Sequence, residues 1–215
     1  MKLNMFKETK MQINKPSKIE MDRISALWAK EAKFENYGYE EKALGWLFKI
    51  YPANTELNAI IVKITCLDNF YGTNLTKGYK IHEVAQEILK LDFDSRVQKG
   101  DISLVDDLAT FGADKGKPKI LSFASKYCVW HNYGVYGKDS FVILDSIVKS
   151  KLKEFNKIYG FSEKFGDKDL DNYAKYKKIL ECFRDVFELK CSLREIDWYL
   201  WRLGKLEKLS KLEKK

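Results

Sequence analysis

Two stretches of the chain decide which fold to expect: Ser122-Phe-Ala-Ser-Lys-Tyr-Cys-Val-Trp-His131 and Val142-Ile-Leu-Asp-Ser-Ile-Val148. The first follows a loop and predicts a helix that carries Lys126 among apolar neighbours. The second places Asp145 directly before Ser-Ile-Val, a position typical of a helix N-cap. Asp145 follows Lys126 by 19 positions. We interpret the two residues as a candidate pair.

Lys126 and Asp145 have the chemistry that removal of a damaged DNA base requires. An amine in a partly apolar site loses proton affinity through desolvation, and this makes it a nucleophile near neutral pH. A carboxylate held by backbone N–H groups stays ionised and can stabilise a cationic sugar or move protons. Lysine is abundant in the chain, and an aspartate cap is routine, so spacing alone leaves a purely structural interpretation open.

Outward from these stretches, the apolar residues recur with helical spacing almost throughout. Two-residue alternation is scarce, and its one candidate, residues 140–144, is too short and solitary to build a sheet. The pattern predicts an all-α protein of nine or ten helices. We expect them at residues 19–35, 41–51, 54–67, 76–91, 101–111, 119–131, 146–159, 169–189 and 193–204.

The composition of the chain limits the number of domains and indicates the cellular compartment. With 215 residues, 45% of them hydrophobic, the chain can bury a core as one domain or two closely packed lobes. We expect a basic N-terminal segment (1–18), a helical domain of two lobes (19–204) and a charged C-terminal tail (205–215). The start of the chain has no signal-peptide pattern, and no stretch is apolar enough to span a membrane. A cytoplasmic protein is the expectation.

The net charge and the cysteine spacing indicate which molecules the protein binds. Thirty-nine Lys and Arg against 31 Asp and Glu give a net charge of +8, which favours a phosphate backbone as partner. The cysteines share no close metal-ligand spacing, so we expect neither a metal nor another cofactor. Their apolar neighbours indicate four buried free thiols, namely Cys66, Cys128, Cys182 and Cys191.

The two opening stretches resemble the catalytic segment of helix-hairpin-helix DNA glycosylases, in particular the type-2 8-oxoguanine DNA glycosylases. That family has a Gly-x-Gly-x-Lys hairpin, and then an apolar-apolar-Leu-Asp turn before the next long helix. Here the corresponding residues are Ser122-Phe-Ala-Ser-Lys126 and Val142-Ile-Leu-Asp145. The family also ends in Asp-x-x-Leu-Trp followed by Gly-Lys, matched by Asp197-Trp-Tyr-Leu-Trp201 and Gly204-Lys205.

The resemblance implies a two-lobed helix-hairpin-helix fold and a role in base excision repair. Lys126 would form a Schiff base with C1′ of the damaged nucleotide and support β-elimination, and Asp145 would assist base loss. The implied partner is double-stranded DNA with a modified base, an oxidised purine, bound by a monomer associated with the nucleoid. Ser122 and Ala124 stand where the family has glycines, which leaves the contact between hairpin and phosphate open.

Polar groups elsewhere are further DNA-binding candidates, each with a structural alternative. Asn69 and Asn74 belong to a loop that could fill the space left by a flipped base, or simply link two helices. His131 and Asn132 could contact DNA or orient a water molecule, or cap their helix.

The last predicted helix carries three more candidates. Trp198 and Trp201 could wall a base pocket by stacking, although most such pairs belong to the core. Asp197 could bind a purine edge, or pair with Arg194. The function we expect is a DNA glycosylase with lyase activity. The alternatives are a non-catalytic nucleic-acid-binding module, a defence glycosylase acting on modified phage bases, and a helical scaffold.

Overall fold

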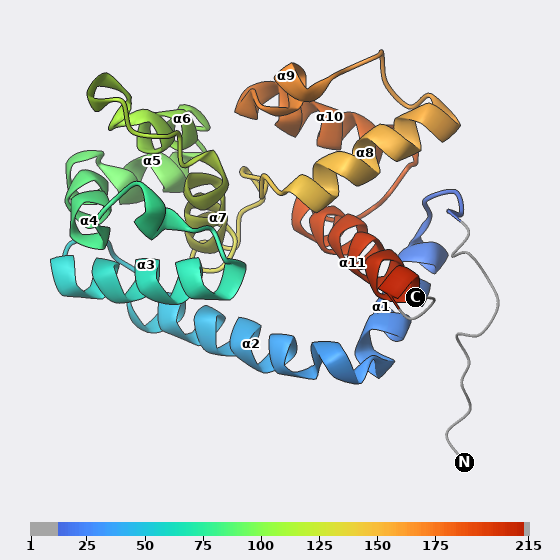
Figure 1. Ribbon diagram of the computed structural model, residues 1–215, viewed down its shortest axis with the longest axis horizontal. Helices are drawn as coiled ribbons and strands as arrows, with labels where there is room; N and C mark the ends of the chain where they lie inside the picture. Colours follow the sequence, from blue (N-terminus) through green and yellow to red (C-terminus); the bar gives the residue numbers. More distant parts are fainter. Residues whose placement is uncertain (1–12, 213–215) are drawn as a thin grey trace.

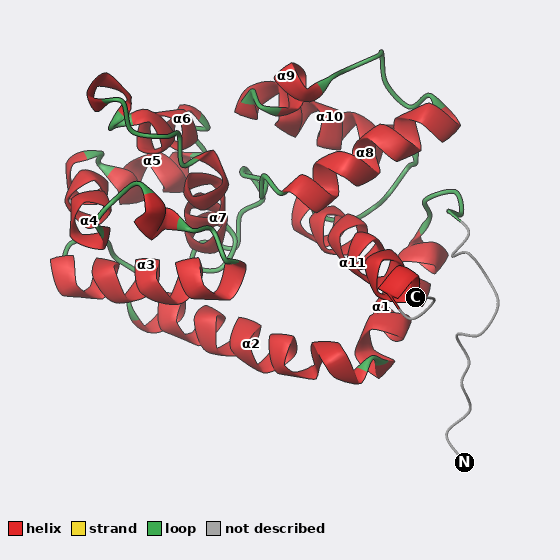
Figure 2. Cartoon of the chain, viewed as in Figure 1, coloured by secondary structure: helices red, strands yellow, loops and turns green. Residues whose placement is uncertain are grey.

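The computed structural model describes residues 13–212, and within them the secondary structure is entirely helical (Figure 2). The expectation of an all-α protein is confirmed. The elements are α1 (Lys18–Lys30), α2 (Glu35–Ile50), α3 (Leu57–Tyr71), α4 (Ile81–Lys90), α5 (Phe93–Lys99), α6 (Ser103–Thr110), α7 (Leu121–Asn132), α8 (Ser146–Tyr159), α9 (Asp167–Leu170), α10 (Tyr173–Val186) and α11 (Leu193–Leu212), with 3₁₀ turns at Ala32–Phe34, Leu75–Lys77 and Ala113–Lys115.

The helices form two groups (Figure 1). Helices α3 to α7 gather on one side, where α3 packs on α4 and α6 packs on α7. Helix α1 and helices α8 to α11 gather on the other, where α11 packs on both α8 and α1. Helix α2 runs along both groups, and residues 133–145 connect α7 to α8 (Figure 1). Helices α1 and α11, from opposite ends of the described chain, therefore pack together within the second group.

The crossing of α8 and α11 depends on a glycine. A Cβ atom added at Gly204 of α11 would collide with Cγ2 of Ile147, in the first turn of α8. Because Gly204 has no side chain, the two helix backbones approach closely there. Val148 and Leu152 of α8 and Leu200 of α11, all fully buried, contribute to the core around this crossing.

Several sequence-based boundaries need correction. Helix α11 continues to Leu212 with Leu206 buried, so residues 205–212 are not a separate charged tail, and residues 213–215 lie outside the described range. Helix α1 begins at Lys18 with Ser17 as its N-cap, while residues 1–12 of the expected basic segment also lie outside. Helix α5 was not predicted because it is short, although it buries Phe93 and Val97.

The cysteine prediction is confirmed only in part. All four thiols are free, but Cys128 alone is classed as buried, while Cys182 and Cys191 are half-buried and Cys66 is exposed. Cys66 follows Ile64 on α3, and its side chain lies on the outer face of that helix, whereas Ile64 is fully buried. Apolar neighbours in sequence therefore did not determine which face of the helix a cysteine occupies.

Candidate active site

Lys126 lies in the second turn of α7 with only 1% of its surface exposed. Its Nζ donates hydrogen bonds to Ser122 Oγ at 2.8 Å and to the Leu144 carbonyl oxygen at 3.2 Å. The ring of Tyr71, from the end of α3, lies 5.2 Å from the same nitrogen. The amine is thus held by α7 itself, by the segment before α8 and by an aromatic face.

The surroundings of Lys126 lower its pKa. Burial is the main cause, because removal from water penalises the ammonium form. The carboxyl groups of Asp145 and Asp197 oppose this effect, and the positive charge of Arg194 adds to it. A lysine in this environment supplies a neutral amine at lower pH than an exposed lysine does, and the neutral amine is the nucleophilic form.

Asp145 caps α8 as predicted. Its Oδ1 accepts a hydrogen bond from the Ile147 backbone N–H at 2.8 Å. Its Oδ2 lies 3.9 Å from Lys126 Nζ, and 20% of the side chain is exposed, against 2% for the lysine. The carboxylate is therefore fixed by the helix terminus on one side, faces the amine on the other and still reaches solvent. The expected pairing of the two residues is present in the structure.

The extended segment before Asp145 has no sheet partner within residues 13–212, and side chains satisfy its backbone instead. Leu144 N–H donates to Ser125 Oγ at 3.0 Å. Val142 N–H donates to the hydroxyl of Tyr173 at 2.9 Å, and the hydroxyl of Tyr176 donates to the Ile143 carbonyl at 2.9 Å. These bonds from α7 and α10 fix the position of Asp145, and they explain why residues 140–144 alternate like a strand without forming one.

A charged network from α11 and α2 borders the pair. Arg194 Nη1 donates to Asp197 Oδ2 at 2.7 Å, and Nη2 lies 3.3 Å from both Glu41 Oε1 and the Tyr71 hydroxyl. The alternative that Asp197 pairs with Arg194 is thus realised. Asp197 Oδ1 is buried and has no hydrogen-bond partner among the described residues. Burial raises the pKa of Asp197 to about 7, although Arg194 acts in the opposite direction.

Ser122 and Ala124 do not form a hairpin. Both lie in the first turn of α7, where Ala124 is fully buried and Ser122 accepts the hydrogen bond from Lys126. The turn that precedes α7 is the loop of residues 112–118, which contains two glycines, and Gly116 has a φ of +69°. Glycines let a backbone come close to a phosphate, and shortly before Lys126 they lie in this loop and not at Ser122 and Ala124.

His131 and Asn132 also lie away from any surface. Asn132 Nδ2 donates to the Val97 carbonyl at 2.8 Å, and Ser140 N–H donates to Asn132 Oδ1 at 2.8 Å. His131 is fully buried, with Nε2 lying 3.2 Å from Asn54 Nδ2 and 3.4 Å from Lys63 Nζ. Direct contact of either side chain with DNA is not compatible with this burial, because both are committed to internal bonds.

Asn69 lies in the last turn of α3 and not in a loop as expected, whereas Asn74 follows the helix; both are exposed. The turn after α3 is organised by Asp68, whose Oδ1 accepts hydrogen bonds from the Thr73 hydroxyl and from Leu75 N–H. Asn74 adopts a left-handed conformation with a φ of +56°, and its side chain donates to the Gly72 carbonyl at 2.9 Å. The turn places amides at the surface close to Tyr71, and their role stays a prediction.

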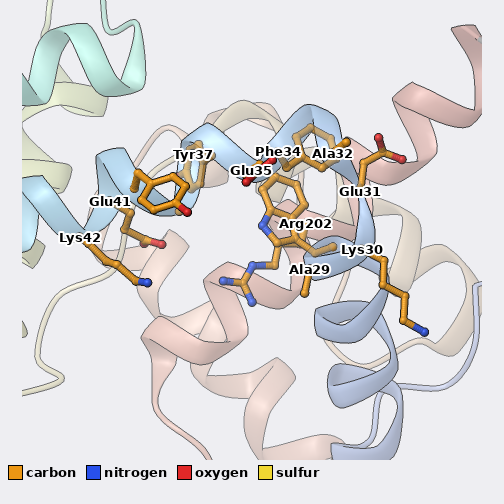
Figure 3. A pocket seen from close by; sticks show the side chains of 13 residues that line it. Ala29, Lys30, Glu31, Ala32, Phe34, Glu35, Tyr37, Glu41, Lys42 and Arg202 are labelled. Carbon is orange, nitrogen blue, oxygen red and sulfur yellow. The ribbon is translucent and has the colours of Figure 1, made fainter.

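The two tryptophans of α11 have different surroundings. Trp198 Nε1 donates to Glu41 Oε1 at 3.0 Å, and the ring lines a pocket of about 350 Å³ together with Trp130, Tyr133 and Arg194. Trp201 packs against Trp28 and Tyr37, with ring centroids 5.2 and 4.9 Å away. A second pocket, of about 630 Å³, lies beside this aromatic cluster and is lined by Trp28, Tyr37 and Arg202, among others (Figure 3).

Sequence reasoning missed Tyr71 and Glu41 as parts of the site. Tyr71 bridges the amine of Lys126 and the indole of Trp130, whose Nε1 donates to the Tyr71 hydroxyl at 3.1 Å. Glu41 joins α2 to Arg194 and Trp198. Neither residue belongs to a motif or lies near Lys126 in sequence, so only the tertiary fold reveals them.

The chain was compared with known proteins. Residues 20–135 match the family HI_0787_N, described as an N-terminal domain. A protein of Haemophilus influenzae (strain ATCC 51907 / DSM 11121 / KW20 / Rd), named only as uncharacterized, is 39% identical over 174 residues, covering 78% of this chain and 80% of the relative. No solved structure matches significantly. The range matched by the family, residues 20–135, includes Lys126 and ends before Asp145.

Residues 13–212 contain no helix with the length and apolar character needed to cross a membrane. They also contain no group of three or more His, Cys, Asp or Glu side chains placed to hold a metal ion.

Proposed function

The chain belongs to the HI_0787_N family, and we propose that it is a DNA glycosylase with lyase activity that removes an oxidised purine from duplex DNA. One observation carries the proposal: the buried Lys126 amine has a lowered pKa and lies 3.9 Å from the Asp145 carboxylate, which a helix N-terminus holds in place. A nucleophile beside a fixed anion suits attack on a sugar carbon that develops positive charge.

The chemistry follows from the roles of these two groups. As the bond between C1′ and the base nitrogen breaks, its electron pair leaves with the base, which takes up a proton. The neutral Lys126 amine adds to C1′, and the sugar ring opens to give an imine. Loss of a proton from C2′ then expels the 3′ phosphate. The Asp145 carboxylate stabilises the cationic sugar, and its solvent-exposed side gives a path for protons.

The substrate has to leave the duplex, because Lys126 cannot reach C1′ inside a base-paired stack. Extrusion of a nucleotide costs a few kcal/mol, which phosphate contacts with the basic protein would offset. We place the exposed amides of Asn69 and Asn74 at the gap left in the duplex. The glycine-containing loop 112–118, in place of Ser122 and Ala124, is the part of the proposed site that approaches phosphate. The protein would act as a monomer on nucleoid DNA.

Borohydride trapping tests the proposal. The protein is incubated with a duplex that carries a single 8-oxoguanine, and sodium borohydride is added to reduce any imine to a stable covalent adduct. We expect an adduct with the unsubstituted chain and none with Lys126→Gln. Lys157→Gln is the matched control, since Lys157 is an exposed lysine on the distant part of α8 and its loss leaves the adduct intact.

The outcome also separates the alternative functions. A non-catalytic DNA-binding module would bind the duplex and give no adduct. A defence glycosylase would give an adduct only with duplexes carrying phage-type modified bases, which belong in the same panel. If Asp145→Asn releases the base as fast as the unsubstituted chain does, the role assigned here to the carboxylate is wrong.

A further inference from the structure

Three aromatic rings from three helices contact one another beside the candidate active site. The ring of Tyr37, in the first turn of α2, lies 4.6 Å from that of Phe70 and 4.9 Å from that of Trp201, between ring centroids. The planes are inclined by 35° and 31°, respectively. Within residues 13–212, no ring contact joins Phe70 directly to Trp201, so Tyr37 fills the space between them.

Ring contacts connect Tyr37 to the surroundings of Lys126. The ring of Phe70, which contacts Tyr37, lies 4.7 Å from that of Tyr71 between ring centroids, and the Tyr71 ring faces the Lys126 amine. Burial raises the pKa of Tyr37 well above its usual range, with contributions from Tyr71, Glu41 and Asp197 and an opposing one from Arg194. Tyr37 is therefore close to the charged groups that border the proposed nucleophile.

The side chain of Tyr37 is held by apolar and ring contacts. No hydrogen bond ties its hydroxyl to the described part of the chain, and α2 begins without a side-chain cap at Phe34. The adjacent pocket of about 630 Å³ is lined by Tyr37 and Gly38 on one side and by Arg202 on another (Figure 3). A Cβ atom at Gly38 would meet nothing within 4 Å. The Tyr37 ring thus has open space beside it and no polar bond to break.

We propose that Tyr37 is a displaceable placeholder: it fills the slot between Phe70 and Trp201 in the free protein, and an extruded purine base moves it into the adjacent pocket. This inference rests on the proposed function. A planar base would keep the stacking contacts with Phe70 and Trp201 that the phenol ring makes. Its hydrogen-bonding edge would lie near Asp197, Glu41 and Arg194, the charged groups that act on Tyr37 in the free protein.

The alternative is that Tyr37 is an ordinary part of the core that joins α2 to α3 and α11. The two cases differ in selectivity. A placeholder competes only with the extruded base for the slot, so its removal should strengthen binding only of DNA that can insert a base there. A core residue supports the fold, so its removal weakens every form of DNA binding together.

The test uses the Lys126→Gln chain, in which the proposed chemistry cannot proceed. Dissociation constants are measured for a duplex with one 8-oxoguanine and for the same duplex with a tetrahydrofuran abasic analogue, which has no base to insert. Tyr37→Ala is expected to bind the 8-oxoguanine duplex at least about threefold more tightly, because the cost of emptying the slot is removed. Its affinity for the abasic analogue is expected to stay within about twofold.

Further variants keep the result interpretable. Trp46→Ala is the matched control, since Trp46 is an aromatic residue on the same helix with 62% exposure and does not line the adjacent pocket, and both of its dissociation constants should stay unchanged. Tyr37→Leu keeps apolar volume if the alanine variant does not fold, and Tyr37→Trp, a larger ring, should weaken binding of the 8-oxoguanine duplex alone.

The possible failures are distinguishable. The placeholder role is overturned if the dissociation constants for both duplexes change equally, or if no Tyr37 variant changes them. In either case the glycosylase proposal stands as long as the unsubstituted chain forms the adduct. Absence of both the adduct and any preference for the 8-oxoguanine duplex overturns the two proposals together.

Discussion

The Lys126 amine donates a hydrogen bond to the carbonyl oxygen of Leu144 at 3.2 Å, and Leu144 directly precedes Asp145. The proposed nucleophile therefore binds the backbone that sets the position of its acidic partner. Ser125, the neighbour of Lys126, accepts the Leu144 N–H at 3.0 Å, so two consecutive residues of α7 hold both polar groups of one residue. The geometry of the pair depends on this docking of residues 141–144 against α7.

Loss of the Ser125 hydroxyl should weaken that docking. Ser125→Ala leaves the buried Leu144 N–H without an acceptor, and an unsatisfied buried amide costs about 1–3 kcal/mol. We expect the free energy of unfolding to fall by that amount in urea titrations, and adduct formation to slow because Asp145 is less well fixed. Ser150→Ala, at an exposed position of α8, serves as the control and should show neither effect.

The crossing of α8 and α11 gives a second prediction. Gly204→Ala should destabilise the protein by about 1–3 kcal/mol, because the new methyl group collides with Ile147 Cγ2. Combining it with Ile147→Ala removes the colliding atom, so the double variant should lose less stability than the sum of the single losses. Gly38→Ala is a useful comparison, since its methyl group meets nothing within 4 Å and the helix should gain stability. Additive losses at Gly204 and Ile147 would show that the helices are not in close contact.

The buried His131 predicts a dependence of stability on pH. Burial and the positive charge of Lys63 place the pKa of His131 well below 6.5 in the folded protein. Below about pH 6.5 the unfolded chain takes up a proton that the folded chain does not, so this contribution to stability is present above pH 6.5 and is lost as the pH falls.

Urea titrations between pH 7.5 and 5.5 measure this effect. The free energy of unfolding should depend less steeply on pH in His131→Gln, because the amide oxygen of glutamine can accept a hydrogen bond from Lys63 and does not titrate. His82→Gln, which replaces the other histidine of the chain, is the control. If the slope of the free energy of unfolding against pH is unchanged in His131→Gln and reduced in His82→Gln, the effect comes from His82 and the prediction is wrong.

Local patterns sufficed for much of this protein. Helical periodicity placed α8 correctly, and the N-cap preference for aspartate placed Asp145. The pairing of Lys126 with Asp145 was predicted from the sequence around each residue and its resemblance to a glycosylase segment, since their spacing of 19 positions alone left a structural interpretation open.

The rest required tertiary structure. Ser122 and Ala124 were assigned to a hairpin, but they lie inside α7, because the turn is formed by the glycines of loop 112–118. DNA contact or a helix cap was expected for His131, whereas the residue is fully buried and its Nε2 contacts Asn54 and Lys63. Tyr37 and Glu41 belong to α2, which is distant in sequence from α7 and α11, so periodicity carried no signal that they meet there.

The most direct test of the central claim is to locate the reduced adduct by mass spectrometry. After borohydride trapping on an 8-oxoguanine duplex, the protein is digested with protease and nuclease, and the peptide that carries the sugar remnant is sequenced. The account predicts a single modified residue, Lys126. Modification of another lysine, or an adduct of equal yield in Lys126→Gln, would contradict it.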